Sequence, residues 1–502
     1  MRLSATASIA ALAITGCTTA DSDATTDMHG AALAANQCEF LATQEVGETA
    51  LETIWVPAAG DVPSYCEVSA TLRPVDGSNI GVVYRLPESW NGDVLGIGGG
   101  AWMGNTTLDA ARDGLLKGFA TMQTNGGHSS TNPWGNEWVV NPVQAEDFSH
   151  RAIHTMTEMG KRVTSAFYDK EHDTAIYSGC STGGRMGLME AQRYPQDYDA
   201  VIVGAPVYTL QVQTSAVLRN HAFAEPQAAF TVPELQMVQD AAIAACDGND
   251  GLEDGLINNP RSCSWQPRTL QCEPGETESC LSPQQVDTLN TLYSGRRASD
   301  GSWAMHPMSR GGEASWGFFN RADGAGQNSD PTRGGGLMGL QPVIFGANPV
   351  DWEQFSDANY LTVRNSDFAR MYEADETDLS PFFERGGKLM LWHGESDAGP
   401  SPVLSNDYAR GVYAANAEAA SQFSYYTVPG MGHCAGGPGA DQIDYLGAMQ
   451  DWLANGRVPD RLIGRKADSD LVRPHCAWPD VARFDGAGDP NDPSNWSCVP
   501  RS

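Results

Sequence analysis

The chain has 502 residues, of which 41% are hydrophobic and 19% charged, and its formal net charge is −31. A single hydrophobic core rarely grows beyond about 250–300 residues, so this length predicts two structural units, and the composition excludes a disordered chain. The electrostatic field of so negative a chain repels the phosphate backbones of nucleic acids, and this excludes nucleic acid as a partner. An anionic substrate would need a local positive group.

The first 17 residues have the pattern of an export signal. A positive start at Arg2 precedes a short, mostly apolar stretch over residues 5–14, too short for a membrane anchor in a mature protein. Residues 14–17 read Ile-Thr-Gly-Cys and resemble the bacterial lipobox, in which the cysteine becomes the lipidated first residue. We expect lipidation at Cys17, a lipoprotein-type signal peptide over 1–17 and a flexible tether over 18–35. The alternative is an ordinary signal peptide, cleaved at a site no later than Ala35.

The cysteine count supports export. Eleven cysteines leave one over if the rest are paired, and a lipidated Cys17 would be that one. We expect an exported protein, periplasmic or anchored to the outer membrane by its lipid, with the extracellular medium as an alternative location. A zinc site is excluded because the sequence contains neither a CxxC pair nor HExxH. The ten cysteines left to pair are Cys38, Cys66, Cys180, Cys246, Cys263, Cys272, Cys280, Cys434, Cys476 and Cys498.

Strand and helix patterns alternate along residues 80–206. Strands are predicted at 82–86, 93–97, 175–177 and 200–203, and helices at 147–168 and 187–193. The alternation breaks near Val207, and strand patterns return at 388–392 and 423–428. Strands that alternate with helices form parallel sheets covered on both faces. The sequence therefore predicts an α/β domain, over 36–207 and 376–502, that carries a large insertion over 208–375.

A candidate nucleophile follows the third predicted strand. Residues 179–183 read Gly-Cys-Ser-Thr-Gly and match G-x-S-x-G between a strand and a helix, the context of a nucleophile elbow. Small residues let the backbone turn sharply there, and the helix N-terminus favours developing negative charge. A plain glycine-rich turn is the alternative. We predict that Ser181 is the nucleophile.

The acid and the base are predicted from chain order. In α/β-hydrolases the acid follows the serine and the histidine comes last. Asp397 lies in the turn after the strand at 388–392, where Glu395 is the rival acid, and His393 is interpreted as structural. His433 lies in a glycine-rich loop after the strand at 423–428 and is the predicted base, unless it is a surface histidine. The other histidines, His128, His150, His154 and His221, are interpreted as core or surface residues.

Two further features support this site. Cys180 precedes the predicted nucleophile and Cys434 follows the predicted base, so a disulfide between them would lock the pair together. Oxyanion stabilisation needs two backbone donors. The amide of Thr182 is one candidate, and the glycines after the strand at 93–97, Gly99 or Gly100, offer the other, unless they form a simple tight turn.

These motifs resemble the tannase and feruloyl esterase family, whose pattern places a cysteine beside the serine and another beside the histidine. The resemblance covers residue 36 to the end of the chain. It implies an α/β-hydrolase core with an inserted lid domain, esters of aromatic acids as substrates, and the disulfides Cys38–Cys66, Cys180–Cys434, Cys246–Cys263, Cys272–Cys280 and Cys476–Cys498. The matching segments are 147–148, 151–152, 179–185, 190–195, 204–206, 385–388, 393–394, 397 and 429–434.

The lid segment contains a candidate calcium loop. Residues 247–256 place acidic side chains at close spacing among glycines, and hard oxygen ligands on a tight loop suit Ca²⁺. The loop is not an EF-hand because no Glu stands at the twelfth position. A solvated acidic turn is the alternative. The resemblance implies a structural calcium ion held by the carboxylates of Asp247, Asp250 and Asp254 and the carbonyls of Leu252 and Leu256.

Substrate choice is expected to depend on the lid. The predicted function is release of aromatic acids, of the feruloyl, galloyl or terephthaloyl type, from small esters through an acyl-enzyme on Ser181. The alternatives are a hydrolase specific for mono(2-hydroxyethyl) terephthalate, a carbohydrate-deacetylating esterase and a non-catalytic aromatic-binding lipoprotein. Arg310 or Arg333 could bind a free carboxylate, and Trp316, Phe318 and Phe319 could stack on the acid ring, unless they are lid core.

Overall fold

The computed structural model describes residues 33–47, 49–130, 132–224, 227–318, 335–348, 350–416 and 419–501. Cys17, Phe319 and Arg333 lie outside the described residues, as do the predicted signal peptide and the side chain of Phe318. Residues 33–41 form a helix that begins inside the predicted tether. Over the described part of the chain, no helix is long and apolar enough to cross a membrane.

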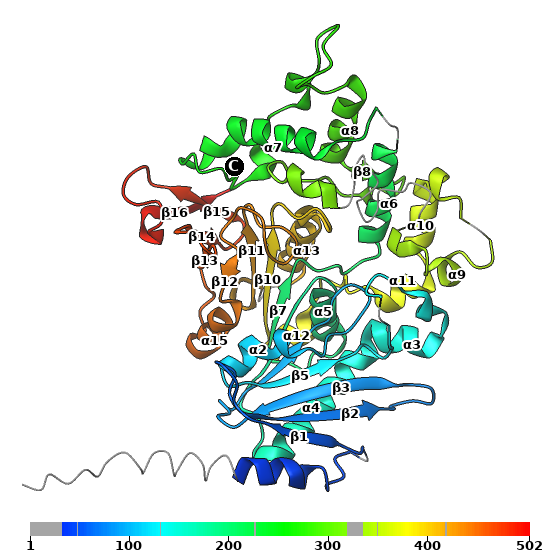
Figure 1. The fold of residues 1–502 in the computed structure, drawn as a ribbon, viewed down its shortest axis with the longest axis vertical. Helices are drawn as coiled ribbons and strands as arrows, with labels where there is room; N and C mark the ends of the chain where they lie inside the picture. Colours follow the sequence, from blue (N-terminus) through cyan, green and yellow to red (C-terminus); the bar gives the residue numbers. More distant parts are fainter. Residues whose placement is uncertain are drawn as a thin grey trace, which may run out of the picture.

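A nine-stranded mixed sheet runs through the centre of the molecule in the order β1-β2-β3-β5-β4-β6-β7-β10-β11 (Figure 1). The strands from β5 to β11 are parallel, and β1, β2 and β3 add an antiparallel edge. The predicted parallel sheet is therefore confirmed. Its strands are β1 (Glu52–Val56), β2 (Tyr65–Leu72), β3 (Ile80–Pro87), β4 (Val94–Ile97), β5 (Ala120–Thr124), β6 (Ala175–Cys180), β7 (Ala200–Gly204), β10 (Lys388–Gly394) and β11 (Phe423–Val428).

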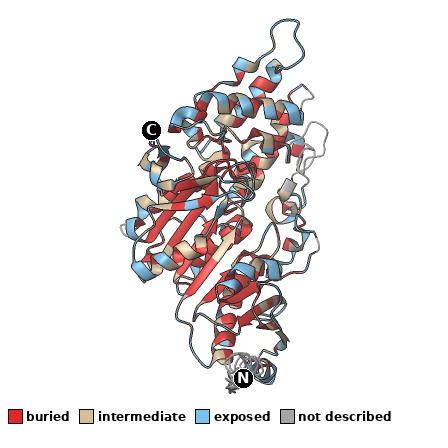
Figure 2. Cartoon of the chain, turned by 60° about the vertical axis from the view of Figure 1, so that its left-hand side comes forward, coloured by how far each residue is buried: buried red, intermediate tan, exposed pale blue. Residues whose placement is uncertain are grey.

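Helices cover both faces of this sheet. Every residue of β7 and β11 is buried, as expected for parallel strands covered on both sides. Figure 2 shows the buried residues concentrated in the strands and on the inner sides of the helices. The helices of the sheet domain are α2 (Leu108–Leu116), α3 (Pro142–Glu146), α4 (Ala152–Tyr168), α5 (Thr182–Arg193), α13 (Pro402–Ala415), α14 (Ala419–Gln422) and α15 (Tyr445–Asn455).

One predicted helix boundary was wrong. The helix predicted over 147–168 is present, with a π-helical turn over Asp147–Arg151 that leads into α4 at Ala152. The helix predicted from residue 187 begins at Thr182, because glycines with low helix propensity fill its first turn. Tertiary packing requires those glycines: a Cβ on Gly183 would lie 2.7 Å from the carbonyl oxygen of Gly99.

The insertion leaves the sheet after β7 and returns before β10, two strands that are neighbours in the sheet. In Figure 1 its helices α7 and α8 lie above the central strands. It has an apolar core of its own, formed by residues such as Phe230, Leu235 and Leu289. Its elements are α6 (Gln211–Phe223), α7 (Val232–Cys246), α8 (Pro283–Ser294), β8 (Arg296–Arg297), β9 (Trp303–Met305), α9 (Gln341–Ile344), α10 (Asp357–Arg364) and α11 (Asp367–Tyr372). Helix α12 (Ser380–Phe383) leads back to the sheet.

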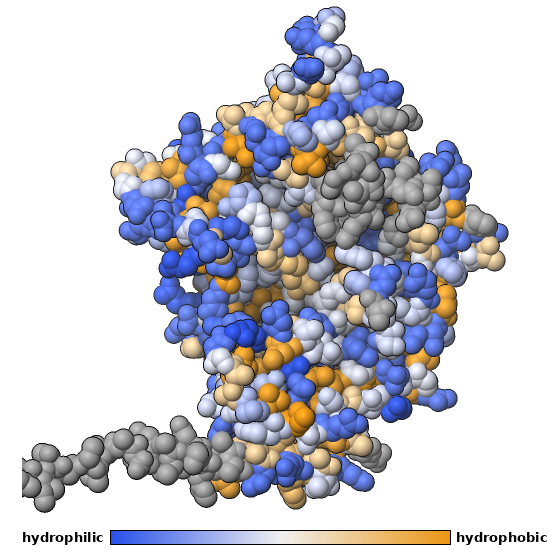
Figure 3. Space-filling view, viewed as in Figure 1, coloured by the Kyte–Doolittle hydropathy of each residue, from blue (hydrophilic) through white to orange (hydrophobic). Residues whose placement is uncertain are grey.

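The C-terminal segment and the disulfides complete the fold. This segment forms two small sheets, one of β12 (Gln442–Ile443), which precedes α15, with β13 (Arg461–Arg465) and β14 (Val472–Cys476), and one of β15 (Asp480–Phe484) and β16 (Trp496–Pro500). All five disulfide pairs that the family resemblance implies are present. Hydrophilic residues cover much of the face in Figure 3, in keeping with the strongly negative net charge.

Candidate active site

The predicted nucleophile stands at the sharp turn between β6 and α5. Ser181 has φ 62° and ψ −123°, a strained conformation for a residue with a side chain. Its backbone N–H donates to the carbonyl oxygen of Gly204 at 2.9 Å, which fixes the turn to β7. A Cβ on Gly179 would lie 2.6 Å from backbone atoms of Gly183, so only glycine fits there. The local geometry is that of a nucleophile elbow.

The structure brings the three predicted triad residues together. The hydroxyl of Ser181 lies 2.9 Å from Nε2 of His433, which can accept its proton. On the other side of the ring, Nδ1–H of His433 donates to Oδ2 of Asp397 at 2.7 Å. The three residues are far apart in the chain, and the ends of β6, β10 and β11 place them side by side.

The charges of the acid and the base stabilise each other. Burial alone would raise the pKa of Asp397, but the charge of His433 and the hydrogen bonds from His393 and His433 hold it well below its ordinary value. Burial alone would lower the pKa of His433, but the charge and hydrogen bond of Asp397 outweigh it and raise the pKa. The carboxylate is thus ionised, and the imidazole is tuned to accept a proton.

His393 and Glu395 lie close to Asp397 in the chain but are not members of the triad. Nε2–H of His393 donates to Oδ2 of Asp397 at 3.1 Å and its Nδ1 contacts the hydroxyl of Ser405 at 2.7 Å, so it is a buried structural residue, as predicted. The rival acid Glu395 is buried and forms ion pairs with Arg261 and Arg501 at 2.8 and 3.4 Å. Its carboxylate is therefore occupied away from the imidazole.

The predicted disulfide joins the elbow to the histidine loop. Cys180 and Cys434 are bonded, with their Cα atoms 6.0 Å apart and a sequence separation of 254. Because each cysteine is adjacent to a triad residue, the bond limits how far Ser181 and His433 can separate.

The three predicted oxyanion donors differ in whether their backbone N–H group is already bonded. Thr182 is the first residue of α5, where N–H groups have no partner inside the helix, and its hydroxyl bonds to the carbonyl oxygen of Ala101. The amide of Gly100 is not a free donor, because it donates to the carbonyl oxygen of Met103 at 3.1 Å. The amide of Gly99 has no acceptor among the described residues. Of the two glycines, only Gly99 therefore has an amide without an acceptor in the described part of the chain.

The predicted calcium loop closes on itself around its carboxylates. Asp247 accepts the backbone N–H groups of Asp254 and Gly255 at 3.2 and 2.7 Å, and Asp250 accepts that of Leu252 at 3.0 Å. Burial and the neighbouring carboxylates raise the pKa of Asp250 to about 7. A cation in the loop would relieve this crowding of negative charge. The hard oxygen donors suit Ca²⁺, although one oxygen of Asp254 already accepts from the nearby Arg473, at 2.5 Å from its Nη2.

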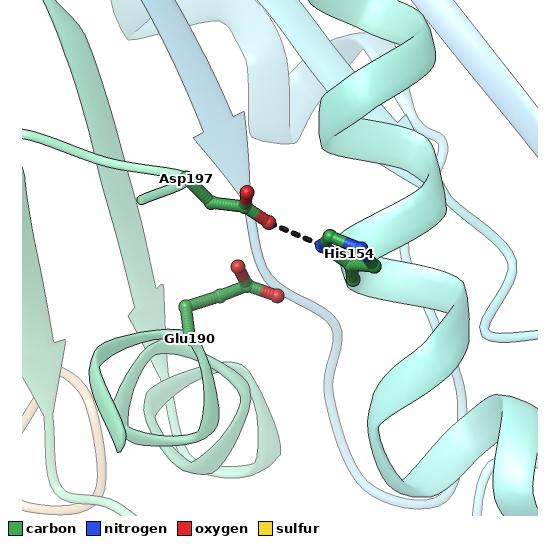
Figure 4. A group of neighbouring side chains, drawn as sticks. All are labelled: His154, Glu190 and Asp197. Atoms are coloured by element: carbon green, nitrogen blue, oxygen red, sulfur yellow. Dashed lines mark hydrogen bonds and ion pairs between the residues drawn. The ribbon is translucent and has the colours of Figure 1, made fainter. Parts of the chain in front are cut away.

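A second group of titratable side chains lies between α4 and α5. Nδ1 of His154 bonds to Asp197 at 2.6 Å, and Glu190 points toward both residues (Figure 4). Neither carboxylate oxygen of Glu190 has a hydrogen-bond partner in the described part of the chain. Burial and the Asp197 carboxylate raise the pKa of Glu190 well above its ordinary value. Sequence reasoning missed this group, because it treated His154 alone.

The other predicted residues lie apart from the triad. His128 stacks on Trp138, with ring centroids 4.0 Å apart, and burial lowers its pKa to about 4. His150 contacts the hydroxyl of Tyr194 at 2.7 Å, and His221 contacts the carbonyl oxygen of Trp352 at 2.6 Å. These three are core or partly buried residues, as predicted.

The described lid candidates belong to the core of the insertion. Trp316 is only 2% exposed and packs beside Tyr293. Arg310 lies over the same tyrosine ring and donates to the carbonyl oxygen of Trp265 at 3.0 Å. Both side chains are therefore engaged inside the insertion.

Comparison with known proteins identifies the family of this site. The family model described as tannase and feruloyl esterase matches residues 66–324 and 344–499. The chain belongs to the tannase and feruloyl esterase family. It is 30% identical to the mono(2-hydroxyethyl) terephthalate hydrolase of Piscinibacter sakaiensis, over 88% of this chain and 86% of that protein. It is also 30% identical to a probable feruloyl esterase B-1 of Aspergillus oryzae, over 87% and 84% of the two chains.

Solved structures show the same fold. Feruloyl esterase B from Aspergillus oryzae superposes with a TM-score of 0.82 at 27% identity, over 93% of this esterase and 100% of that chain. The tannin acyl hydrolase of Aspergillus niger, at 22% identity and a TM-score of 0.73, shares the fold over 90% of each chain. This chain is accordingly a carboxylic ester hydrolase with an α/β-hydrolase fold and an inserted domain.

Proposed function

We propose that this esterase releases aromatic acids from their esters through an acyl-enzyme on Ser181. One observation carries the proposal: a continuous chain of hydrogen bonds runs from Ser181 through His433 to Asp397, and it starts at a strained elbow. A histidine between a serine hydroxyl and a buried carboxylate can remove the hydroxyl proton during attack and return it to the leaving group.

The reaction proceeds in two halves. In acylation, Oγ of Ser181 attacks the ester carbonyl while its proton moves to Nε2 of His433. The imidazolium, stabilised by Asp397, then protonates the departing alcohol as the ester C–O bond breaks. In deacylation, water loses a proton to His433 and attacks the acyl group, and the proton returns to Ser181 as the free acid leaves.

The backbone provides the electrostatic part of catalysis. The N–H groups of Thr182 and Gly99 donate to the carbonyl oxygen as it becomes an oxyanion. The two donors are held near each other because the glycine loop packs directly on the first turn of α5. A Cβ on Gly98 would lie 2.4 Å from Gly183. Loss of a single such donor typically costs about 10²–10³-fold in kcat.

The names of the relatives support the aromatic acyl group. One relative is a hydrolase of mono(2-hydroxyethyl) terephthalate, and others are feruloyl esterases, so both names specify esters of an aromatic acid. The insertion, residues 208–375, acts in this proposal as the lid that covers the acyl group. The five disulfides support folding in an oxidising compartment, and we propose export with a lipid anchor at Cys17 in the outer membrane.

A calcium ion is proposed for the loop 247–256. The carboxylates of Asp247, Asp250 and Asp254 and the carbonyls of Leu252 and Leu256 would hold it, and it would supply positive charge that stiffens the lid. We expect EGTA to lower the melting temperature of the wild-type protein and calcium to restore it. Asp250→Asn should lower the melting temperature and abolish that response. An unchanged melting temperature in EGTA would contradict the calcium site.

The test of the function is product release from three esters: methyl ferulate, methyl gallate and mono(2-hydroxyethyl) terephthalate. We expect turnover of at least one aromatic ester by the calcium-loaded, oxidised protein. Ser181→Ala is the matched blank and should lose at least about 10⁴-fold while it remains folded. Turnover of none of the three, or full activity in the blank, would contradict the proposal.

A further inference from the structure

The peptide group after the proposed catalytic acid is held from two sides. Its N–H, from Gly399, donates to Oδ1 of Asp397 at 2.7 Å. Its C=O, from Ala398, accepts a hydrogen bond from Nη1 of Arg219 at 2.7 Å, and the same nitrogen also donates to the carbonyl oxygen of Gly399 at 3.0 Å. One peptide group therefore connects a guanidinium to the carboxylate of Asp397.

Arg219 comes from the insertion and not from the sheet. It lies on α6, is only 4% exposed and touches the sulfur of Met308, also in the insertion. A buried guanidinium is costly unless its donors meet acceptors, and its principal acceptors are these two carbonyls. A charged group at each end of a peptide unit polarises that unit, so both hydrogen bonds strengthen together.

We propose that Arg219 is a positioning residue for Asp397, by which the lid fixes the catalytic acid. The inference rests on the proposed function and adds that the triad is complete only when the insertion is seated. Arg219 acts through the Ala398–Gly399 peptide and touches neither the substrate nor the reacting atoms. The other charged or titratable groups that face Asp397 are His393 from β10 and His433 from the loop after β11.

A positioning role predicts that the pKa of His433 shifts in one direction, which a purely structural role does not. Removal of a positive charge near the Asp397–His433 pair favours the protonated imidazole, so the pKa of His433 rises. Because His433 must be neutral to accept the proton of Ser181, the acid limb of the pH profile moves to higher pH. A freer Asp397 also orients the imidazole less well, which lowers kcat more than it raises KM.

The experiment compares Arg219→Met and Arg219→Lys with a matched control, Arg261→Met. Arg261 also reaches from the insertion to the turn at 394–397, but it pairs with Glu395. Each protein is assayed for kcat and KM across pH with p-nitrophenyl acetate, for the rate of Ser181 labelling by a fluorophosphonate, and for the pKa of His433 by NMR titration. The NMR titration requires no turnover, and Arg219→Lys retains the charge if Arg219→Met fails to fold.

In Arg219→Met we expect kcat to fall about 10- to 100-fold and the acid limb and the His433 pKa to rise together by about half a unit or more. Arg219→Lys should recover part of each change, and Arg261→Met should leave the pH profile of the wild type. An unchanged His433 pKa with kcat within about twofold in folded Arg219→Met would overturn the positioning role alone. A wild-type protein inert to the fluorophosphonate would overturn the proposed function, and the positioning role with it.

Discussion

Two histidine–aspartate pairs in this protein have almost the same inner geometry. Nδ1 of His433 lies 2.7 Å from Asp397, and Nδ1 of His154 lies 2.6 Å from Asp197. The far nitrogen distinguishes them. Nε2 of His433 meets the hydroxyl of Ser181 at 2.9 Å, whereas Nε2 of His154 has the carboxylate of Glu158 3.7 Å away.

The acids also differ in what surrounds them. Asp397 accepts bonds from His393 and Gly399 besides His433, and its pKa is lowered despite burial. Beside Asp197, the buried Glu190 has no partner for either oxygen among the described residues, and its pKa is raised. A histidine–carboxylate pair is therefore a candidate catalytic site only where a nucleophile meets the far nitrogen and donors keep the acid ionised.

The largest difference between the two pairs is expected when the aspartate of each pair is neutralised in turn. Asp397→Asn should lower kcat about 10⁴-fold, because the amide no longer holds His433 in the tautomer that accepts the serine proton. Asp197→Asn makes the same chemical change in the other pair and should leave kcat within about threefold. Steady-state kinetics on methyl ferulate measures both. Similar losses in the two variants would show that the triad assignment is incomplete.

A smaller effect is expected from the disulfide that ties the triad together. Replacement of Cys180 and Cys434 by alanine opens a loop of 254 residues and should cost about 5 kcal/mol of unfolding free energy. Replacement of Cys272 and Cys280 opens a loop of only 8 residues and should cost about 2 kcal/mol.

Activity separates the two disulfide variants further. We expect about a tenfold loss of kcat only in the first, because only that bond holds Ser181 and His433 together. Chemical denaturation and kinetics below the melting temperature provide the two readouts. Equal activity in both variants would mean that the elbow and the histidine loop are positioned without the Cys180–Cys434 bond.

The smallest expected effect concerns Glu190 and pH. Folding raises the pKa of Glu190 above its ordinary value of 4.5, so the folded protein retains a proton that the unfolded chain releases. The contribution of Glu190 to the unfolding free energy therefore decreases as pH rises above 4.5. The raised pKa of His154 acts in the same direction, because the stability it contributes is lost as pH rises through its folded pKa.

Glu190→Gln resembles the protonated acid and tests this linkage. The variant should be more stable than wild type by about 1 kcal/mol at pH 8, equal to it near pH 4, and unchanged in kcat. Urea denaturation across pH measures the difference. Glu158→Gln is the matched control, since Glu158 is half-exposed at the rim of the same group. A less stable Glu190→Gln variant at pH 8 would show that the ionised form is the one the fold requires.

The sequence predicted the chemistry of the site better than its surroundings. Ser181, His433 and their adjacent cysteines lie in short motifs whose residue types have few other uses, so the elbow and its disulfide were readable locally. The early start of α5 was missed because its first-turn glycines are placed by packing against the glycine loop after β4 and the end of β7, and not by helix propensity. The amide of Gly100 donates to Met103 in a turn that the sequence offered only as an alternative.

Long-range contacts account for the other misses. Arg219 meets the Ala398–Gly399 peptide across 179 residues, and no local pattern signals that contact. Trp316 was offered as a substrate contact, but its neighbours in the insertion bury it. A buried arginine in an insertion is a signal worth searching for, since its donors must meet acceptors somewhere in the fold.

The central claim is that this esterase works through an acyl group on Ser181. The most direct measurement is the mass of the protein quenched in acid during turnover of methyl ferulate, followed by peptide mapping. The account predicts one feruloyl group on the peptide that contains Ser181 in the wild type, accumulation of this adduct in a variant slow to deacylate, and none in Ser181→Ala. Turnover without any adduct in that slow variant, or an acyl group on another residue, would contradict it.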